Sequence, residues 1–182
     1  MLRISTLLLL IALTGAAQAT EAGWGLLRNG GHVVLIRSAM APGTGEPQNF
    51  EIDKCRTQRN LSERGRQQAR KIGALIAARA APVERVLTSR YCRTRETARL
   101  AFSDSEDFAP LDPPAADETA RTAQMEAILQ EIRDYSGSGN FILVTHLETI
   151  KALTGESARE GEAVIVRPEA DRLHILARII FN

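Results

Sequence analysis

The stretch NFILVTH, residues 140–146, decides the fold, because its apolar and β-branched residues follow one another without alternating with polar ones. Such a run is typical of a strand that is buried on both faces, as in a parallel sheet covered by helices. The stretch HVVLIR, residues 32–37, has the same character. Together the two runs predict a sheet whose central strands are completely buried.

Helical patterns separate the predicted strands. The clearest one begins after residue 60, with Ser62 or Asn60 as its N-cap, and ends near Ala81 and Pro82. Further helices are predicted at residues 21–30, 94–102, 119–135 and 147–153, and further strands at 85–88, 163–167 and 173–181. Because strands alternate with helices, we expect a three-layer α/β/α sandwich with a mostly parallel sheet.

The first residues have the pattern of a secretory signal peptide. Arg3 provides a positive start, residues 7–13 are an apolar run, and Ala17-Gln18-Ala19 is a small-residue cleavage site. A transmembrane anchor needs about 20 apolar residues, far more than this run offers. We therefore expect residues 1–19 to be cleaved and residues 20–182 to form a single exported domain without a membrane span. The domain would be periplasmic if the source is a Gram-negative bacterium.

The charge balance argues against nucleic acid as a partner. The 182 residues carry 23 basic and 22 acidic side chains, and signal cleavage removes Arg3, so the exported domain is neutral. A neutral domain has no long-range field to attract a polyanion. Most of the basic residues are Arg, which suits local bidentate binding of phosphate or carboxylate.

Polar side chains stand at the carboxyl ends of the predicted strands. Arg37 and Ser38 end the first strand, Arg93 stands at the head of the helix after the second, and His146 ends the strand at residues 140–146. Ligands of open α/β sheets bind just beyond these ends. Two arginines, a hydroxyl and an imidazole could form a pocket for a phosphoryl group. A purely structural histidine is the alternative that spacing leaves open.

Four segments resemble motifs of the histidine phosphatase superfamily, which has the phosphoglycerate-mutase-like fold. They are LIRSA at residues 35–39, NLSERGRQQA at 60–69, SRYCRTRETA at 89–98 and VTH at 144–146, in the family's order. The resemblance implies a phosphate pocket built from Arg37, Arg93 and His146, with a small phosphorylated molecule as its ligand. Exported relatives include phosphatases of sugar phosphates, which are one class of ligand to expect.

Position 38 departs from the family's pattern. The family has at this place the histidine that attacks phosphorus, whereas this chain has Ser38. A serine hydroxyl becomes a comparable nucleophile only with an adjacent base or a metal. His32, His146 and His174 lie on separate predicted strands without the spacing of a zinc site, and no cofactor is expected. We expect Ser38 to keep a hydrogen bond to phosphate while turnover falls by several orders of magnitude.

The sequence also leaves open which residue would serve as the general acid. Family members often place a carboxylate shortly after the helix of the second motif, where Asp117 or Glu118 could serve. Glu148, close to His146, is a further candidate. The alternative is that Asp117 and Glu118 only cap the next helix, whose N-terminus favours negative charge.

The long loop at residues 38–60 forms the predicted surroundings of the pocket, because loops of this length in a compact domain are usually functional. Arg59 at its end could bind substrate or lie at the surface. Acid from Glu46, Glu51 and Asp53 would disfavour highly anionic substrates if it faces inward.

Cys55 and Cys92 flank this loop and the pocket helix. In an exported protein two cysteines are a candidate disulfide, which would tie the loop down beside Arg93. One alternative is two independent thiols, and another is a reactive Cys92 whose pKa is lowered by the neighbouring arginine.

Three functions fit the sequence. The first is an exported phosphomonoesterase with full or residual activity, and the second is a phospho-ligand-binding or interaction protein without catalysis, a pseudophosphatase. The third is an intact enzyme whose histidine was changed in this particular chain. Ser38 is the residue that discriminates between the first two.

Overall fold

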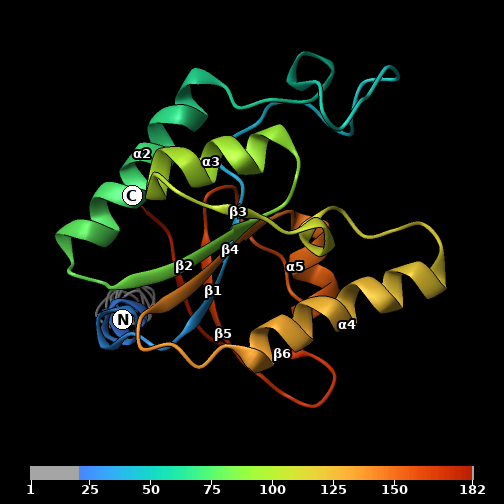
Figure 1. Cartoon of the computed structure of the whole chain (residues 1–182). Coiled ribbons are helices and arrows are strands. Elements are labelled where there is room, and N and C mark those ends of the chain that lie inside the picture. The colour runs from blue at the N-terminus through green and yellow to red at the C-terminus, as the bar shows by residue number, and fades with distance from the viewer. Residues whose placement is uncertain (1–20, 182) are drawn as a thin grey trace, which may run out of the picture.

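The computed structural model describes residues 21–181, in which a six-stranded sheet forms the middle layer (Figure 1). The predicted signal peptide at residues 1–19 lies outside the described residues. The strands are β1 Val33–Arg37, β2 Val83–Thr88, β3 Glu106–Asp107, β4 Asn140–Thr145, β5 Ala163–Pro168 and β6 Leu173–Ile179. Their order across the sheet is β3-β2-β4-β1-β5-β6.

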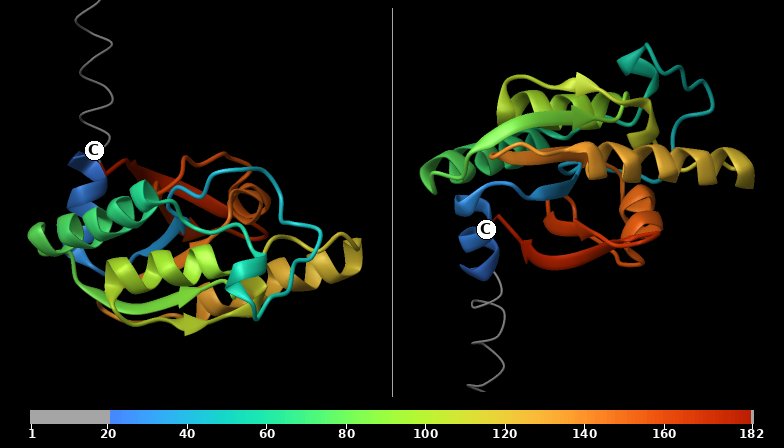
Figure 2. Two further views of the ribbon diagram at one scale, coloured as in Figure 1. Left: turned by 90° about the horizontal axis from the view of Figure 1, so that it is seen from above. Right: turned by 60° about the horizontal axis from the view of Figure 1, so that its bottom comes forward.

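Helices cover both faces of this sheet (Figures 1 and 2). They are α2 Glu63–Ala78, α3 Cys92–Phe102, α4 Glu118–Asp134 and α5 Leu147–Thr154, with short 3-10 turns η1 Cys55–Thr57 and η2 Ala109–Leu111. The helical residues 21–29 lie with α2 and α3 on one face, and α4 and α5 cover the other. Within residues 21–181, no helix combines the length and apolar character that crossing a membrane requires.

The sheet is mostly parallel. The strands β3, β2, β4 and β1 run in one direction, whereas β5 and β6 add an antiparallel pair beside β1. This arrangement confirms the predicted three-layer α/β/α fold and its closing pair of strands. It also brings the carboxyl ends of β1, β2 and β4 together at one end of the sheet, as parallel strands require. We call this end, where the three strands terminate, the strand edge.

The central strands are buried on both faces, which explains their lack of polar alternation. In β1, Val34 and Ile36 pack under α2 and α3, whereas Val33 and Leu35 pack under α4 and α5. Successive side chains of a strand point to opposite faces, so each face needs its own apolar residues. The apolar clusters on the two faces thus fix the position of β1, and with it the position of the residues that follow the strand.

Several boundaries differ from the prediction by one to three residues, among them the start of β2 at Val83 and the end of β6 at Ile179, and one short strand was not predicted. Helix α2 ends at Ala78 rather than near Ala81, because Arg79 is its C-cap and Ala80 has a left-handed φ of 52°. The predicted irregular segment at residues 103–118 contains β3, whose two residues are polar and exposed. Such a short strand has no hydrophobic period that a sequence could reveal.

Candidate functional site

The site lies where β1, β2 and β4 end. Arg37 pairs in register with Thr145, so that Ser38 and His146 follow side by side on neighbouring strands. The Ser38 amide donates to the Thr145 carbonyl at 2.9 Å, which extends this pairing past the end of β1. Ser89 follows the adjacent strand β2. The fold thus gathers the strand-end residues that the sequence singled out.

His146 is 2% exposed and hydrogen-bonded through both ring nitrogens. Its Nδ1 lies 2.9 Å from Arg93 Nη2, and its Nε2 lies 2.7 Å from the Ser89 hydroxyl. Arginine can only donate, so Nδ1 accepts, and Nε2 carries the proton that is donated to Ser89. Burial, reinforced by the charge of Arg93, holds the pKa of His146 well below its usual value. The imidazole is therefore neutral.

The hydrogen bonds continue from Ser89 to Asp112, which the sequence analysis did not single out. The Ser89 hydroxyl donates to Asp112 Oδ1 at 2.8 Å, and Arg90 donates to Oδ2 through Nε at 2.9 Å and Nη2 at 2.7 Å. Asp112 is 8% exposed. It directly follows η2 in an irregular segment, where no period or motif marks it. The carboxylate orients Ser89, and Ser89 in turn orients the ring of His146.

Arg93 lies in the first turn of α3 and is 3% exposed. Its Nη1 donates to the Glu46 carboxylate and its Nη2 donates to His146. Its Nε is buried and has no hydrogen-bond partner among residues 21–181. The guanidinium also lies 4.9 Å from the centre of the Tyr91 ring. Burial lowers the pKa of Arg93, an effect that Glu46 opposes, but an arginine stays protonated and remains a donor.

Arg37, the last residue of β1, is half-buried beside the segment that leads into β5. Its Nη1 donates to the Ala158 carbonyl at 2.8 Å, and its Nη2 lies 3.8 Å from Glu160 Oε1. Ser38, the next residue, is 5% exposed. Each pocket arginine therefore has a glutamate within ion-pair distance.

The loop at residues 38–60 reaches the site through Glu46. One carboxylate oxygen of Glu46 accepts from Arg93, and the other accepts from the Arg59 amide at 2.9 Å. The Arg59 side chain turns back on the loop, where Nη1 donates to the carbonyls of Ala41 at 2.9 Å and Gly43 at 3.0 Å. Arg59 Nε is a second buried donor without a partner in the described residues.

The other two acids of the loop do not face the pocket. Glu51 pairs with Lys54 where both side chains are about half exposed, and Asp53 is exposed. The sequence alone could not tell these three acids apart, because the loop has no period. Glu46 is thus the loop acid that lies inward.

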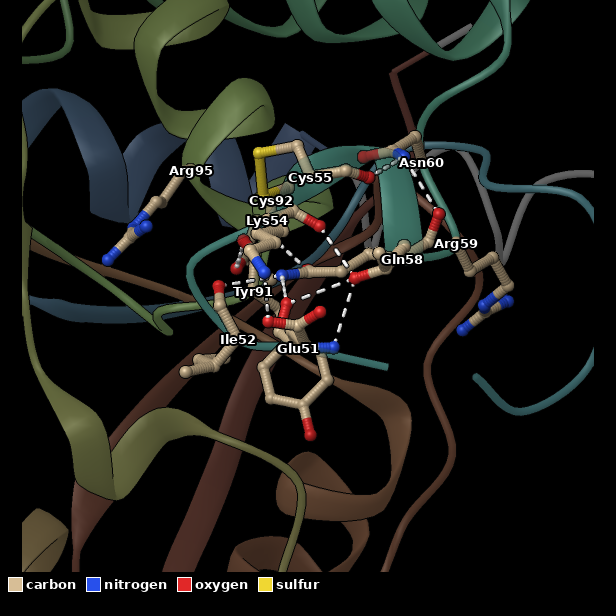
Figure 3. The surroundings of a disulfide bond; sticks show 12 residues. Glu51, Ile52, Lys54, Cys55, Gln58, Arg59, Asn60, Tyr91, Cys92 and Arg95 are labelled. Carbon is tan, nitrogen blue, oxygen red and sulfur yellow. Dashed lines mark hydrogen bonds and ion pairs between the residues drawn. A yellow bond between two sulfur atoms is a disulfide. The ribbon is translucent and has the colours of Figure 1, made fainter. Parts of the chain in front are cut away.

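A disulfide joins Cys55 of the loop to Cys92 at the start of α3 (Figure 3). The predicted disulfide is thus confirmed, and both alternatives, two independent thiols and a reactive Cys92, are excluded, since neither cysteine is free. Gln58 strengthens the junction: its Oε1 accepts from the Cys92 amide at 2.9 Å, and its Nε2 donates to the carbonyls of residues 51 and 52. The anchor adjoins Arg93, so the loop is tied down beside the pocket.

The three candidate acids lie on helix starts. Asp117 is the N-cap of α4, where its Oδ1 accepts from the Ala120 amide at 2.8 Å. Glu118 pairs with Arg121, and Glu148 is an exposed residue in the first turn of α5. Asp117 and Glu118 thus make the contacts expected of residues that cap the start of α4. In the described part of the chain, no three His, Cys, Asp or Glu side chains gather as a metal-binding group.

Comparison with known families yields one match at the site. Residues 49–113, which include the disulfide, Ser89, Arg93 and Asp112, match the histidine phosphatase superfamily, branch 1. The match covers about a third of the chain. No curated protein matches the chain.

Solved structures share the fold at low sequence identity. A candidate alpha-ribazole-5'-P phosphatase from Escherichia coli K-12 has a TM-score of 0.63 at 14% identity, over 82% of this chain and 97% of that one. Phosphoglycerate mutase from Thermus thermophilus has a TM-score of 0.55 at 18% identity, over 82% and 98%. The protein histidine phosphatase SixA, complexed with tungstate, has a TM-score of 0.55 at 18% identity, over 82% and 97%. The fold is phosphoglycerate-mutase-like, as the motifs implied.

Proposed function

We propose that this chain binds a phosphate monoester at the edge formed by β1, β2 and β4, and hydrolyses it slowly or not at all. Arg37 and Arg93 would donate hydrogen bonds to the phosphoryl oxygens, and the Ser38 hydroxyl would add another. The resemblance to a superfamily of phosphatases and mutases supports a phosphorylated ligand. Arg93 Nε, which is buried without a hydrogen-bond partner among residues 21–181, is a further donor that an anion could satisfy.

The hydrogen bonding of His146 is the observation that carries this proposal. Its Nδ1 accepts from Arg93 and its Nε2 donates to Ser89, so neither nitrogen can take the proton of the Ser38 hydroxyl. The lowered pKa of His146 also makes the ring a poor proton acceptor. Without a base, a serine hydroxyl is a weak nucleophile at neutral pH. The arrangement therefore supports binding rather than turnover.

A histidine at position 38 would behave differently. A neutral imidazole attacks phosphorus directly and needs no separate base, because it is itself nucleophilic near pH 7. In this chain the same position offers a hydroxyl, and His146 is not free to accept its proton. Arg37 and Arg93, the second of which is oriented by its hydrogen bond to His146, would then hold a bound phosphoryl group that Ser38 does not attack.

The proposal includes export. Residues 1–19 would act as a signal peptide and direct the domain out of the cytoplasm, to the periplasm if the source is Gram-negative. The Cys55–Cys92 disulfide supports this, because disulfides persist in oxidising compartments. A sugar phosphate is the class of ligand that we propose, with no cofactor.

Titration of the purified protein with inorganic phosphate or tungstate tests the binding site. We expect binding, and we expect Arg37→Gln to weaken it about tenfold or more because a charge-assisted contact is lost. Arg99→Gln is the matched control, since Arg99 lies exposed on α3. The absence of any binding would overturn the site, and p-nitrophenyl phosphate turnover near the common enzymatic range of about 1–1000 per second would overturn the proposed loss of catalysis.

A further inference from the structure

Glu46 stands where an anionic ligand would compete for Arg93. We propose that Glu46 is a specificity-determining residue, an internal carboxylate that occupies Arg93 and that a phosphate ligand must displace. The inference rests on the proposed phosphate site and extends it to the loop. Its basis is the ion pair of Glu46 with Arg93, a side chain that is almost completely buried.

Glu46 engages Nη1, one of the donors through which Arg93 would hold a phosphoryl group. Arginine binds phosphate best through two parallel N–H donors. In Arg93, Nη1 already donates to Glu46 and Nη2 to His146. A phosphate that approaches this guanidinium meets a carboxylate on one side, and like charges at this range repel strongly where water is largely excluded. Bidentate binding that uses Nη1 therefore requires Glu46 to leave.

The loop is built so that Glu46 can leave without unfolding the domain. Residues 42–45 and 47–49 are exposed on either side of it. Gly43 and Gly45 have φ of 95° and 68°, and no atom of the described residues lies within 4 Å of the place where a Cβ on Gly45 would be. The following part of the loop is fixed to α3 by the Cys55–Cys92 disulfide. An exposed tip, held by its hydrogen bonds to Arg59, and a base fixed by the disulfide would allow a local displacement that ends at the anchor.

Arg37 also has a glutamate nearby that balances its charge, but this contact is weaker. Glu160 lies 3.8 Å from Arg37 and also accepts from the Ala41 amide at 3.3 Å. Glu46 makes the closer contact, and its partner Arg93 is the more deeply buried arginine. We therefore assign the larger effect on anion affinity to Glu46.

The test compares Glu46→Gln with Glu51→Gln, using inorganic phosphate as the probe. Both substitutions remove one negative charge from the same loop, but Glu51 contacts exposed Lys54 rather than the pocket. A glutamine side chain is nearly isosteric with glutamate, and its amide oxygen can still accept from the Arg59 amide. We expect Glu46→Gln to tighten phosphate binding about tenfold or more, which corresponds to a binding-competent fraction of about one tenth in the unsubstituted chain. We expect Glu51→Gln to leave the affinity unchanged.

Thermal unfolding gives a second readout of the same competition. Glu46→Gln should lower the melting temperature without phosphate, because Arg93 loses its charged partner, and should enlarge the stabilisation that phosphate provides. Binding by the unsubstituted chain with an equal or weaker affinity in Glu46→Gln would overturn the role of Glu46 while the phosphate site stands. If neither protein binds phosphate, the proposed function itself fails.

Discussion

The strand edge and the loop that closes over it are built in different ways. At the edge, Arg93 and His146 are 3% and 2% exposed and linked by a direct hydrogen bond. The loop at residues 38–60 has no strand or α-helix and is exposed over much of its length. It reaches the edge through the Glu46 carboxylate and is fixed by the Cys55–Cys92 disulfide.

This difference separates two tasks. The parallel sheet places the anion-binding groups, because strand register fixes Arg37, Ser38 and His146 relative to one another. In the function that we propose, the loop would adjust the charge of this site through Glu46 and would select which ligands enter it. A fold can therefore keep a phosphate site while position 38 and the loop change what the site does.

The largest expected effect comes from changing the chemistry of the edge without changing its structure. Ser38→His should raise p-nitrophenyl phosphate hydrolysis by several orders of magnitude, because an imidazole nucleophile replaces a hydroxyl that has no base. Initial rates of the variant and the unsubstituted chain measure this. Arg99→Gln, at an exposed position, serves as the control for the effect of a substitution outside the site. Equal, negligible rates in Ser38→His would mean that other parts of the edge are no longer competent.

Removing the anchor of the loop should cost less. The disulfide closes a loop between positions 37 residues apart in sequence, which is worth roughly 3–4 kcal/mol in the chain-entropy model. The double variant Cys55→Ser with Cys92→Ser should lose about this much free energy of unfolding in urea. The reduced unsubstituted protein is the matched control and should give the same value. A loss below about 1 kcal/mol would show that the loop's other contacts hold it without the disulfide.

Ser89→Ala tests the hydrogen-bond chain at the edge. It leaves the Nε2–H of His146 buried without its acceptor, which should destabilise the fold by about 1–3 kcal/mol. Urea unfolding measures the change. Ser157→Ala, at an exposed position, provides the comparison and should change the free energy of unfolding by less than about 0.5 kcal/mol. Similar values for the two variants would contradict a structural role for the Ser89 hydroxyl.

The same contrast explains how much could be predicted from the sequence. Strand ends follow from hydrophobic runs and parallel topology, so the sequence alone could place Arg37, Ser38 and His146 together. Asp112 and the inward position of Glu46 could not be predicted, because each reaches the site from an irregular segment through contacts that no period encodes. Asp117 shows the reverse case, since a helix N-cap and a general acid have the same sequence signature and differ in what they touch.

The smallest expected effect is a pH dependence of folding stability that arises from His146 and does not involve the loop. Its pKa in the folded protein lies well below the usual 6.5, so the unfolded chain binds a proton there that the folded chain does not. Folding stability should therefore fall as the pH is lowered below 6.5, by up to about 1.4 kcal/mol per pH unit. His146→Gln can still accept from Arg93 and donate to Ser89, but it has no proton to gain. Between about pH 6.5 and pH 5, the free energy of unfolding of the unsubstituted chain should therefore fall more than that of the variant. Parallel pH profiles of the two proteins would mean that the imidazole is not held neutral.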